Sequence, residues 1–153
     1  LAKRGADVLG IDISKNLIDV ANDRKPSELS QKVQFKSGDM LLDGRGKFDY
    51  VVAMDSLIHY GVEDITVALS QLAENTTNSI LFTIAPKTMF LSSVLALGKL
   101  LPQSDRSPRI VPVSCRSLNE YLKMTSNLKE TEVEVLKRIK VSFYISEALK
   151  IKL

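Results

Sequence analysis

The first part of the chain alternates short apolar runs with a helix-like stripe, and turn residues separate them. Residues 7–13 (DVLGIDI) form a β-branched run that ends in an acid, and residues 33–37 form a second run closed by Gly-Asp. Between them, apolar side chains including Leu17 recur at helical spacing over residues 14–23, with Ser14 as the expected N-cap. These patterns predict a strand, a helix and a strand.

The middle of the chain repeats this rhythm with longer apolar runs. Phe48 to Met54 (FDYVVAM) is nearly continuous, which is typical of a central parallel strand covered on both faces. Residues 79–85 (SILFTIA) predict another buried strand. The helical stripe between these two strands consists of Ile65, Ala68, Leu69, Leu72 and Ala73. Together the elements predict an α/β fold, a Rossmann-like doubly wound sheet.

The last third of the chain departs from this rhythm. Residues 89–101 predict an apolar helix inside an insert of about 87–116, which is a candidate substrate cover. A short helix over 118–124 follows, and residues 132–139 and 141–145 read as two closing strands. We expect these two strands to pair antiparallel at the edge of the sheet.

Composition narrows the possible sites. With 153 residues, 44% apolar, the chain fits a single domain over 1–153 and leaves no room for a second. Cys115 is the only cysteine and His59 the only histidine, which excludes an internal disulfide, the usual His/Cys metal sites and a Cys-His pair with a second histidine. The net charge of +3 is scattered along the chain, so no nucleic-acid partner is predicted.

The beginning of the sequence reads as an interrupted element. Leu1 fits neither an initiator methionine nor a signal peptide. Ala2 to Arg4 followed by Gly5 is typical of the last turn of a helix with a glycine stop. We therefore expect the first strand of the sheet, and the Gly-rich loop after it, to be missing from this sequence.

Acidic residues follow three of the predicted strands, at the sheet edge where doubly wound folds bind ligands. Asp12 is placed to accept hydrogen bonds from both hydroxyls of a ribose, or is an ordinary turn acid. Asp39 could accept from an adenine amino group while the backbone of Met40 contacts the ring, or belongs to a Gly-Asp turn. Asp55, with Ser56, lies near the expected position of a transferable group, or caps its own loop. The first two acids together favour an adenosine-containing ligand.

His59 follows the strand nearest the expected reaction centre. A lone histidine is more often a packing residue than a catalytic one. The position of His59 in this loop, however, favours a role in the reaction.

Several segments, taken together, resemble the magnesium-protoporphyrin IX O-methyltransferases of chlorophyll and bacteriochlorophyll biosynthesis, which are class I S-adenosylmethionine-dependent methyltransferases. The glycine-acid elements are shared by many methyltransferases, whereas the segments containing Leu-Ile-His-Tyr and Phe-Thr-Ile-Ala-Pro-Lys-Thr are far more particular. The likeness covers essentially the whole chain. The sequence departs from the family pattern in lacking the Gly-x-Gly-x-Gly loop. The segments are 10–14 (GIDIS), 38–41 (GDML), 52–60 (VAMDSLIHY), 79–88 (SILFTIAPKT), 98–108 with Arg106, and 143–146 (FYIS).

The resemblance implies methyl transfer from S-adenosylmethionine to a propionate carboxylate of magnesium-protoporphyrin IX, giving the monomethyl ester. Because a propionate is ionised at neutral pH, it needs no general base, and we expect His59 and Tyr60 to position the propionate or the magnesium. The magnesium belongs to the substrate, and no protein metal site is expected. Cofactor contacts are expected from Asp12, Ile13, Asp39, Met40, Asp55 and Ser56. Lys87, Arg106 and Arg109 are candidates to pair with propionates, or are solvated charges.

The resemblance also implies contact with magnesium chelatase. It further implies that the protein is cytoplasmic and peripheral to photosynthetic membranes. The alternatives are a methyltransferase for another small molecule and a non-catalytic methyltransferase-like module. A nicotinamide-dependent oxidoreductase ranks lower because no tyrosine is followed four residues later by lysine. Without the missing loop, these 153 residues are expected to bind S-adenosylmethionine poorly and to methylate nothing.

Overall fold

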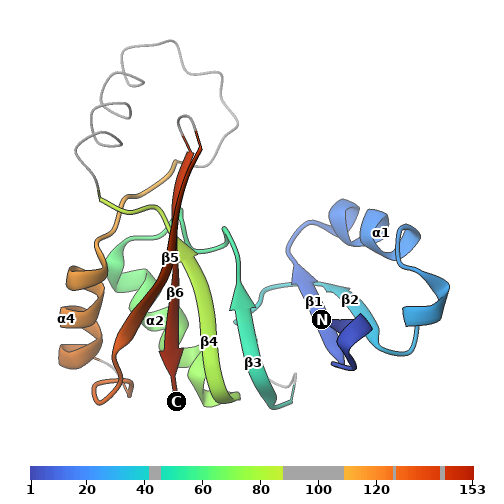
Figure 1. Cartoon of the computed structure of the whole chain (residues 1–153), viewed down its shortest axis with the longest axis horizontal. Coiled ribbons are helices and arrows are strands. Elements are labelled where there is room, and N and C mark those ends of the chain that lie inside the picture. Colours follow the sequence, from blue (N-terminus) through green and yellow to red (C-terminus); the bar gives the residue numbers. More distant parts are fainter. Residues whose placement is uncertain (42–45, 88–108, 126, 142–143) are drawn as a thin grey trace, which may run out of the picture. The chain divides into compact units, whose positions relative to one another are not determined.

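The computed structural model describes residues 1–41, 46–87, 109–125, 127–141 and 144–153. The chain divides into two compact units, Leu1–Arg45 and Gly46–Leu153, each with its own sheet (Figure 1). The helix predicted over 89–101, most of the expected substrate cover, and Arg106 lie outside the described residues.

The first unit confirms the strand, helix and strand predicted for it. Strand β1 (Val8–Asp12) and strand β2 (Val33–Ser37) pair in parallel, in register from Val8 opposite Val33 to Asp12 opposite Ser37. Helix α1 (Lys15–Asp23) connects them, followed by the short 3-10 helix η2 (Ser27–Leu29). The parallel register brings the carboxyl ends of both strands to one edge of this small sheet.

Local chemistry explains how α1 begins and how closely β2 packs. The Ser14 Oγ atom accepts a hydrogen bond from the Leu17 backbone N–H at 3.4 Å, as predicted for an N-cap. Ile18 is buried, but the expectation that Leu17 shares the buried face is wrong, because a sheet of two strands covers only a narrow stripe of the helix. A Cβ atom on Gly10 would lie 2.6 Å from the Phe35 ring, so this ring rests directly on the β1 backbone.

The chain begins with a helical turn that ends at a glycine. The 3-10 helix η1 (Ala2–Arg4) stops at Gly5, whose φ of 96° lies in the left-handed region and whose N–H donates to the Ala2 carbonyl. The predicted role of Gly5 as a helix stop is confirmed.

The second unit is built on a four-stranded sheet in the order β3-β4-β6-β5. Strand β3 (Phe48–Ala53) is parallel to β4 (Thr76–Ile84), whereas β6 (Tyr144–Lys152) is antiparallel to both β4 and β5 (Val133–Val141). The predicted antiparallel pairing of the closing strands is confirmed.

The predicted bounds of the last strand are wrong. Val141 ends β5, and β6 runs on to Lys152 instead of ending at Ile145. Along β6, buried Ile145, Leu149 and Ile151 alternate with more polar positions, but the acid at Glu147 interrupts the apolar series, so the second half of the strand was not recognised.

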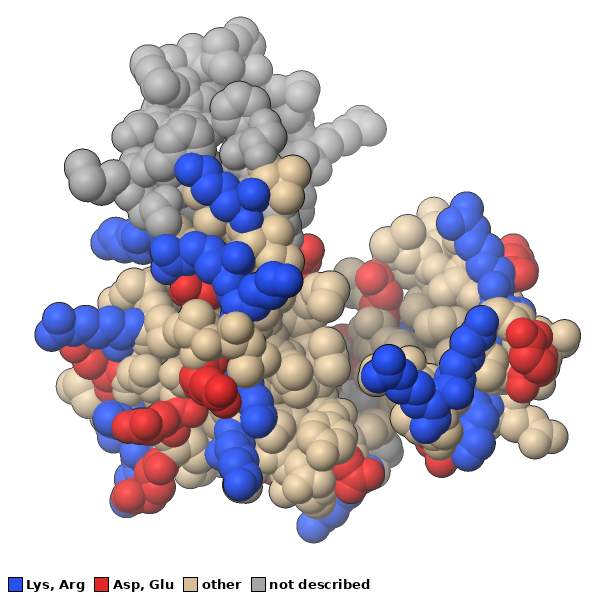
Figure 2. Space-filling view, in the orientation of Figure 1, with Lys and Arg blue, Asp and Glu red and all other residues tan. Residues whose placement is uncertain are grey.

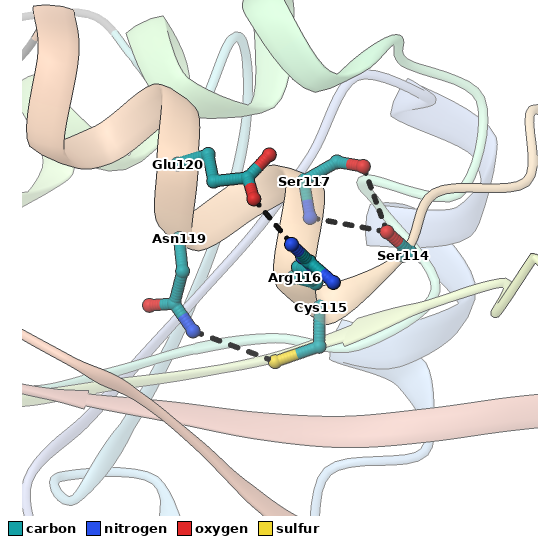
Figure 3. Close-up of polar contacts among 6 residues, drawn as sticks. All are labelled: Ser114, Cys115, Arg116, Ser117, Asn119 and Glu120. Atoms are coloured by element: carbon teal, nitrogen blue, oxygen red, sulfur yellow. Dashed lines mark hydrogen bonds and ion pairs between the residues drawn. The ribbon is translucent and has the colours of Figure 1, made fainter.

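Two helices cover one face of this sheet. Helix α2 (Val62–Glu74) buries Ile65, Ala68, Leu69 and Leu72, as its stripe predicts. Helix α4 (Cys115–Thr125) buries Leu118 and Leu122 completely. It begins earlier than predicted because the Ser114 Oγ atom accepts a hydrogen bond from the Ser117 N–H at 3.0 Å (Figure 3).

The expectation that β3 is covered on both faces is wrong in this structure. Tyr50 is 61% exposed and Val52 is 52% exposed. Both lie opposite β4 residues on the sheet face that carries neither α2 nor α4. Among the described residues β3 pairs with β4 alone, so the apolar run alone did not determine how the strand is covered.

The packing of α2 gives a direct test of where the core of this unit lies. Leu69→Ala removes a completely buried side chain and should lower the free energy of unfolding by about 2–5 kcal/mol. Val67→Ala, on the exposed side of the same helix, should change it by less than about 0.5 kcal/mol. Urea denaturation followed by circular dichroism measures both, and equal losses would place the core elsewhere.

Candidate functional site

In the first unit, two carboxylates lie at neighbouring strand ends. Asp12 is the last residue of β1, its Oδ1 atom accepts from the Ser14 N–H at 2.7 Å, and its carbonyl accepts from the Gly38 N–H at 2.9 Å. The Asp39 Oδ1 atom accepts from the Leu41 N–H at 2.9 Å. Each acid therefore has the turn contact that the sequence left open as the simpler alternative. These contacts also fix both carboxylates at one edge of the sheet.

The two apolar neighbours of these acids differ in exposure. Ile13 is largely exposed directly after β1, and Met40 is half-buried after Asp39. A flat ring held at this edge would find an apolar side chain beside each carboxylate.

In the second unit, Asp55 is held in an unusual backbone conformation after β3. Its φ of 53° is in the left-handed region, which an aspartate tolerates better than most residues. The Asp55 N–H donates to the Thr83 Oγ1 atom at 2.7 Å, and the Thr83 hydroxyl donates to the Asp55 Oδ1 atom at 3.0 Å. Ser56, the next predicted residue, donates its hydroxyl to the Met54 carbonyl at 3.1 Å.

Thr83 is a residue that the sequence reasoning missed. It lies one residue before the end of β4, and its hydroxyl holds both the backbone and the carboxylate of Asp55. The available signal was a single hydroxyl near the end of an otherwise apolar run, SILFTIA. A polar residue at the carboxyl end of a buried strand faces the ligand edge of an α/β sheet, so it belonged among the candidates.

His59 is half-buried and hydrogen-bonded through one ring nitrogen. Its Nδ1 atom lies 3.2 Å from the Arg109 carbonyl oxygen, and the Val111 N–H donates to the Ile58 carbonyl beside it at 2.9 Å. Because a carbonyl can only accept, this hydrogen bond requires the proton on Nδ1, and in the neutral imidazole the lone pair is then on Nε2. The structure thus brings predicted residues His59 and Arg109 together, through the Arg109 backbone.

The segment after β4 lies beside the segment that leads into α4. The Val113 N–H donates to the Ala85 carbonyl at 2.9 Å, and the Lys87 N–H donates to the Val113 carbonyl at 3.2 Å, around a parallel bridge between Pro86 and Val113. The side chains of Lys87 and Arg109 are exposed, and Tyr60 is partly exposed. One edge of this sheet therefore carries the predicted imidazole, phenol and two cations.

The lone thiol is a packing group. The Cys115 Sγ atom lies 3.8 Å from the Val133 carbonyl oxygen and 3.9 Å from the Asn119 Nδ2 atom at the start of α4 (Figure 3). Burial, with a smaller contribution from the charge of Glu147, raises the pKa of the Cys115 thiol above its ordinary value. A thiol that resists ionisation is a weaker nucleophile, and the contacts of Cys115 join α4 to β5.

A tyrosine and a glutamate join the two helices. The Tyr121 hydroxyl donates to the Glu63 Oε1 atom at 3.0 Å. This hydrogen bond and the negative charge of Glu63 raise the pKa of the Tyr121 hydroxyl. The contact links α4 to α2.

Two sequence profiles match the chain. One, described as the C-terminus of magnesium-protoporphyrin IX methyltransferase, matches residues 53–152. A general methyltransferase domain matches residues 1–78.

Individual relatives agree with the profiles. The magnesium-protoporphyrin O-methyltransferase of Rhodobacter capsulatus is 48% identical over 150 residues, 98% of this chain and 64% of the relative. The enzyme of the same description from Synechocystis sp. is 33% identical over 71% of this chain and 48% of its own length. The chain thus spans less than two thirds of the length of these relatives.

A solved structure matches the chain over nearly its whole length. The magnesium protoporphyrin IX methyltransferase of Synechocystis PCC 6803, crystallised with SAH, has a TM-score of 0.76 and 26% identity, over 99% of this chain and 66% of that one. The predicted α/β Rossmann-like methyltransferase fold is thereby confirmed. The chain belongs to the magnesium-protoporphyrin IX methyltransferase family.

Proposed function

We propose that this chain takes part in methyl transfer from S-adenosylmethionine to a propionate carboxylate of magnesium-protoporphyrin IX, giving the monomethyl ester. The observation that carries the proposal is the half-buried His59, whose Nδ1 atom is hydrogen-bonded to a backbone carbonyl at the carboxyl edge of β3 and β4. Histidines that bind a metal characteristically donate the other ring N–H to a carbonyl or carboxylate. As the name of the R. capsulatus relative states, the substrate of that enzyme contains magnesium.

The residues of the first unit fit the adenosine part of the cofactor. Asp12 and Asp39 each have one carboxylate oxygen fixed by a backbone N–H, at the edge where the two parallel strands end. A fixed carboxylate suits the paired hydroxyls of a ribose and the amino group of adenine. S-adenosylmethionine supplies an activated methyl group when bound. The proposed contacts are Asp12, Ile13, Asp39 and Met40 in the first unit, and Asp55 and Ser56 in the second.

The chain's task in this reaction is to position groups, since no proton must be removed. A propionate is ionised at neutral pH and is itself the nucleophile. We propose that the His59 Nε2 atom binds the substrate's magnesium, that Tyr60 orients the reacting propionate, and that Lys87, Arg106 and Arg109 attract the carboxylates. Correct placement and loss of water around the carboxylate then provide the acceleration.

Further expectations from the sequence are also part of this proposal. The general methyltransferase profile runs across the boundary between the two units, which supports a single methyltransferase domain. Contact with magnesium chelatase and with photosynthetic membranes stays a prediction that rests on the resemblance described for the sequence. No helix among the described residues has the length and apolar character needed to cross a membrane.

The proposed reaction can be tested with a chimera in which this chain replaces the segment that it matches in the R. capsulatus relative, here called the extended protein. With S-adenosylmethionine and magnesium-protoporphyrin IX it should form the monomethyl ester, detected by mass spectrometry. The 153-residue chain alone should form none. Cofactor binding without ester formation would support a methyltransferase but reject magnesium-protoporphyrin IX as its substrate. Absence of both cofactor binding and ester would favour a non-catalytic module.

His59 variants separate metal binding from loop support. In the extended protein, His59→Ala should raise the KM for magnesium-protoporphyrin IX about tenfold or more, a loss of roughly 1.4 kcal/mol. His59→Asn retains an N–H donor for the Arg109 carbonyl but lacks Nε2, so it should be equally impaired. Affinity for the metal-free porphyrin should not change. Recovery in the Asn variant would show that the ring only supports its loop.

Thr83 variants test whether the hold on Asp55 matters for cofactor binding. Thr83→Val removes the hydroxyl that bonds Asp55 twice and should weaken S-adenosylmethionine binding by about tenfold. Thr77→Val is the matched control, since that hydroxyl bonds the Phe48 carbonyl and the Asp49 carboxylate at the opposite end of β3 and β4. Calorimetric titration with the cofactor should distinguish the two, and equal affinities would remove Thr83 from the site.

A further inference from the structure

The hairpin of β5 and β6 projects past the end of β4 at the same edge of the sheet as His59. Ile84, the last residue of β4, lies opposite Glu147, and Glu147 lies opposite Arg138. Beyond this row, and within the part of the chain that the structure describes, β5 and β6 pair only with each other, up to Val141 opposite Tyr144 (Figure 1). Three further residue pairs at roughly 3.3 Å each extend the hairpin about 10 Å beyond β4. The projecting part lies at the edge of the sheet where β3 and β4 end, the edge that carries the proposed substrate residues.

Glu147 is a buried carboxylate in an apolar series. Its side chain is 5% exposed, on the sheet face that also carries Ile145 and Leu149. The Glu147 Oε1 atom accepts from Arg138 Nε at 3.0 Å and from Arg138 Nη2 at 2.7 Å. Burying a charge is costly, and an apolar side chain at this position would usually stabilise the protein at least as well. The pair therefore suggests a role other than stability.

The guanidinium that Glu147 holds is still open to a ligand. The Arg138 side chain is 56% exposed, and two of its five N–H donors are directed at Glu147. In the described part of the chain no other partner is recorded for the remaining donors. A guanidinium with a fixed orientation and free donors is well suited to bind a second carboxylate in a planar, two-point contact.

The surroundings of Arg138 fit an anionic, largely apolar ligand. Lys137 and Lys140 are also exposed on the outer half of β5, and Ile139 and Val141 expose apolar side chains between and beyond them. Figure 2 shows Lys and Arg side chains gathered at the upper end of β5 and β6. Lys140 shares the face of β5 that carries Arg138, whereas Ile139 and Val141 lie on the opposite face. Basic and apolar groups thus meet at this end of the hairpin, which fits a ligand with an apolar body and carboxylate arms.

The distance across the sheet selects for a large ligand. Asp55 bonds Thr83, the residue before Ile84, and Arg138 lies two strands beyond Ile84. With strands about 4.8 Å apart, the backbones of Asp55 and Arg138 lie roughly 14 Å apart along this edge of the sheet. A small metabolite at Asp55 would not reach Arg138, whereas a tetrapyrrole with propionate arms would.

We propose, on the basis of the proposed function, that Arg138 binds the propionate of the substrate that is not methylated, and that Glu147 is the positioning residue that orients Arg138. With one carboxylate anchored at the hairpin, only the other can reach the transferred methyl group. The pair thereby favours porphyrins that keep a free propionate for Arg138 over the diester, and limits the product to one ester.

Binding of three porphyrins tests the anchor. Absorption titration of the 153-residue chain and of the extended protein would use the magnesium porphyrin as diacid, monomethyl ester and dimethyl ester. The unsubstituted protein should bind the diacid and monoester about tenfold more tightly than the diester, the difference expected for one charge-assisted contact. Arg138→Gln should remove this difference and leave diester affinity unchanged.

Further variants separate anchoring from folding. Arg138→Lys keeps a charge for Glu147 but lacks the planar fork, so it should fold and recover only part of the discrimination. The double variant Arg138→Met/Glu147→Leu removes both charges together, which avoids a lone buried carboxylate, and should also lose discrimination. Arg116→Gln is the matched control, because Arg116 forms an ion pair with Glu120 at 3.0 Å on the exposed side of α4 (Figure 3).

The outcomes for this anchor are distinct from those for the reaction. If the extended protein forms ester and Arg138→Gln keeps the KM and the discrimination of the unsubstituted protein, the anchor is wrong and the reaction stands. If the variant weakens diacid and diester alike, Arg138 is structural and the anchor is also wrong. If no ester forms while Arg138-dependent discrimination between diacid and diester persists, the anchor stands and the proposed reaction fails.

Discussion

The hydrogen bonding of β4 on both of its edges is the constraint on which the second unit depends. On one side β4 is parallel to β3, and on the other it is antiparallel to β6, so its last residues lie between the loop after β3 and the projecting hairpin. Thr83 bonds Asp55, Ile84 faces Glu147, and Ala85 bonds Val113. Three consecutive residues thus hold the loop, the hairpin and the approach to α4 at one edge of the sheet.

The charges at this edge fall into two groups with different physical settings. Lys87 and Arg109 are exposed, and exposed cations attract anions without fixing them. Arg138 is held by a buried carboxylate, so its orientation is set before any ligand arrives. A reaction at an already ionised carboxylate depends on orientation and removal of water more than on proton transfer, and the fixed cation serves that need better.

Much of the fold was predictable because the apolar periods are regular. The run from Val8 and the stripe around Ile65 each have one interpretation, and the structure agrees with both. The end of β6 was missed because Glu147 lies in a core position, where a pattern based on apolar residues reads a charge as the end of a strand. The partners of Thr83 and Arg138 could not be identified from the sequence, since they are 28 and 9 residues away and only strand pairing brings them together.

The left-handed backbone of Asp55 restricts how this site can vary among relatives. Few side chains other than those of aspartate, asparagine and glycine tolerate such a conformation, and only the first two offer an oxygen to the Thr83 hydroxyl. A relative with glycine at this position would keep the loop shape but have no side-chain acceptor for that hydroxyl. A relative with a branched residue would have to rebuild the loop. Apart from an exchange between aspartate and asparagine at position 55, residues 55 and 83 should therefore change together over evolutionary time.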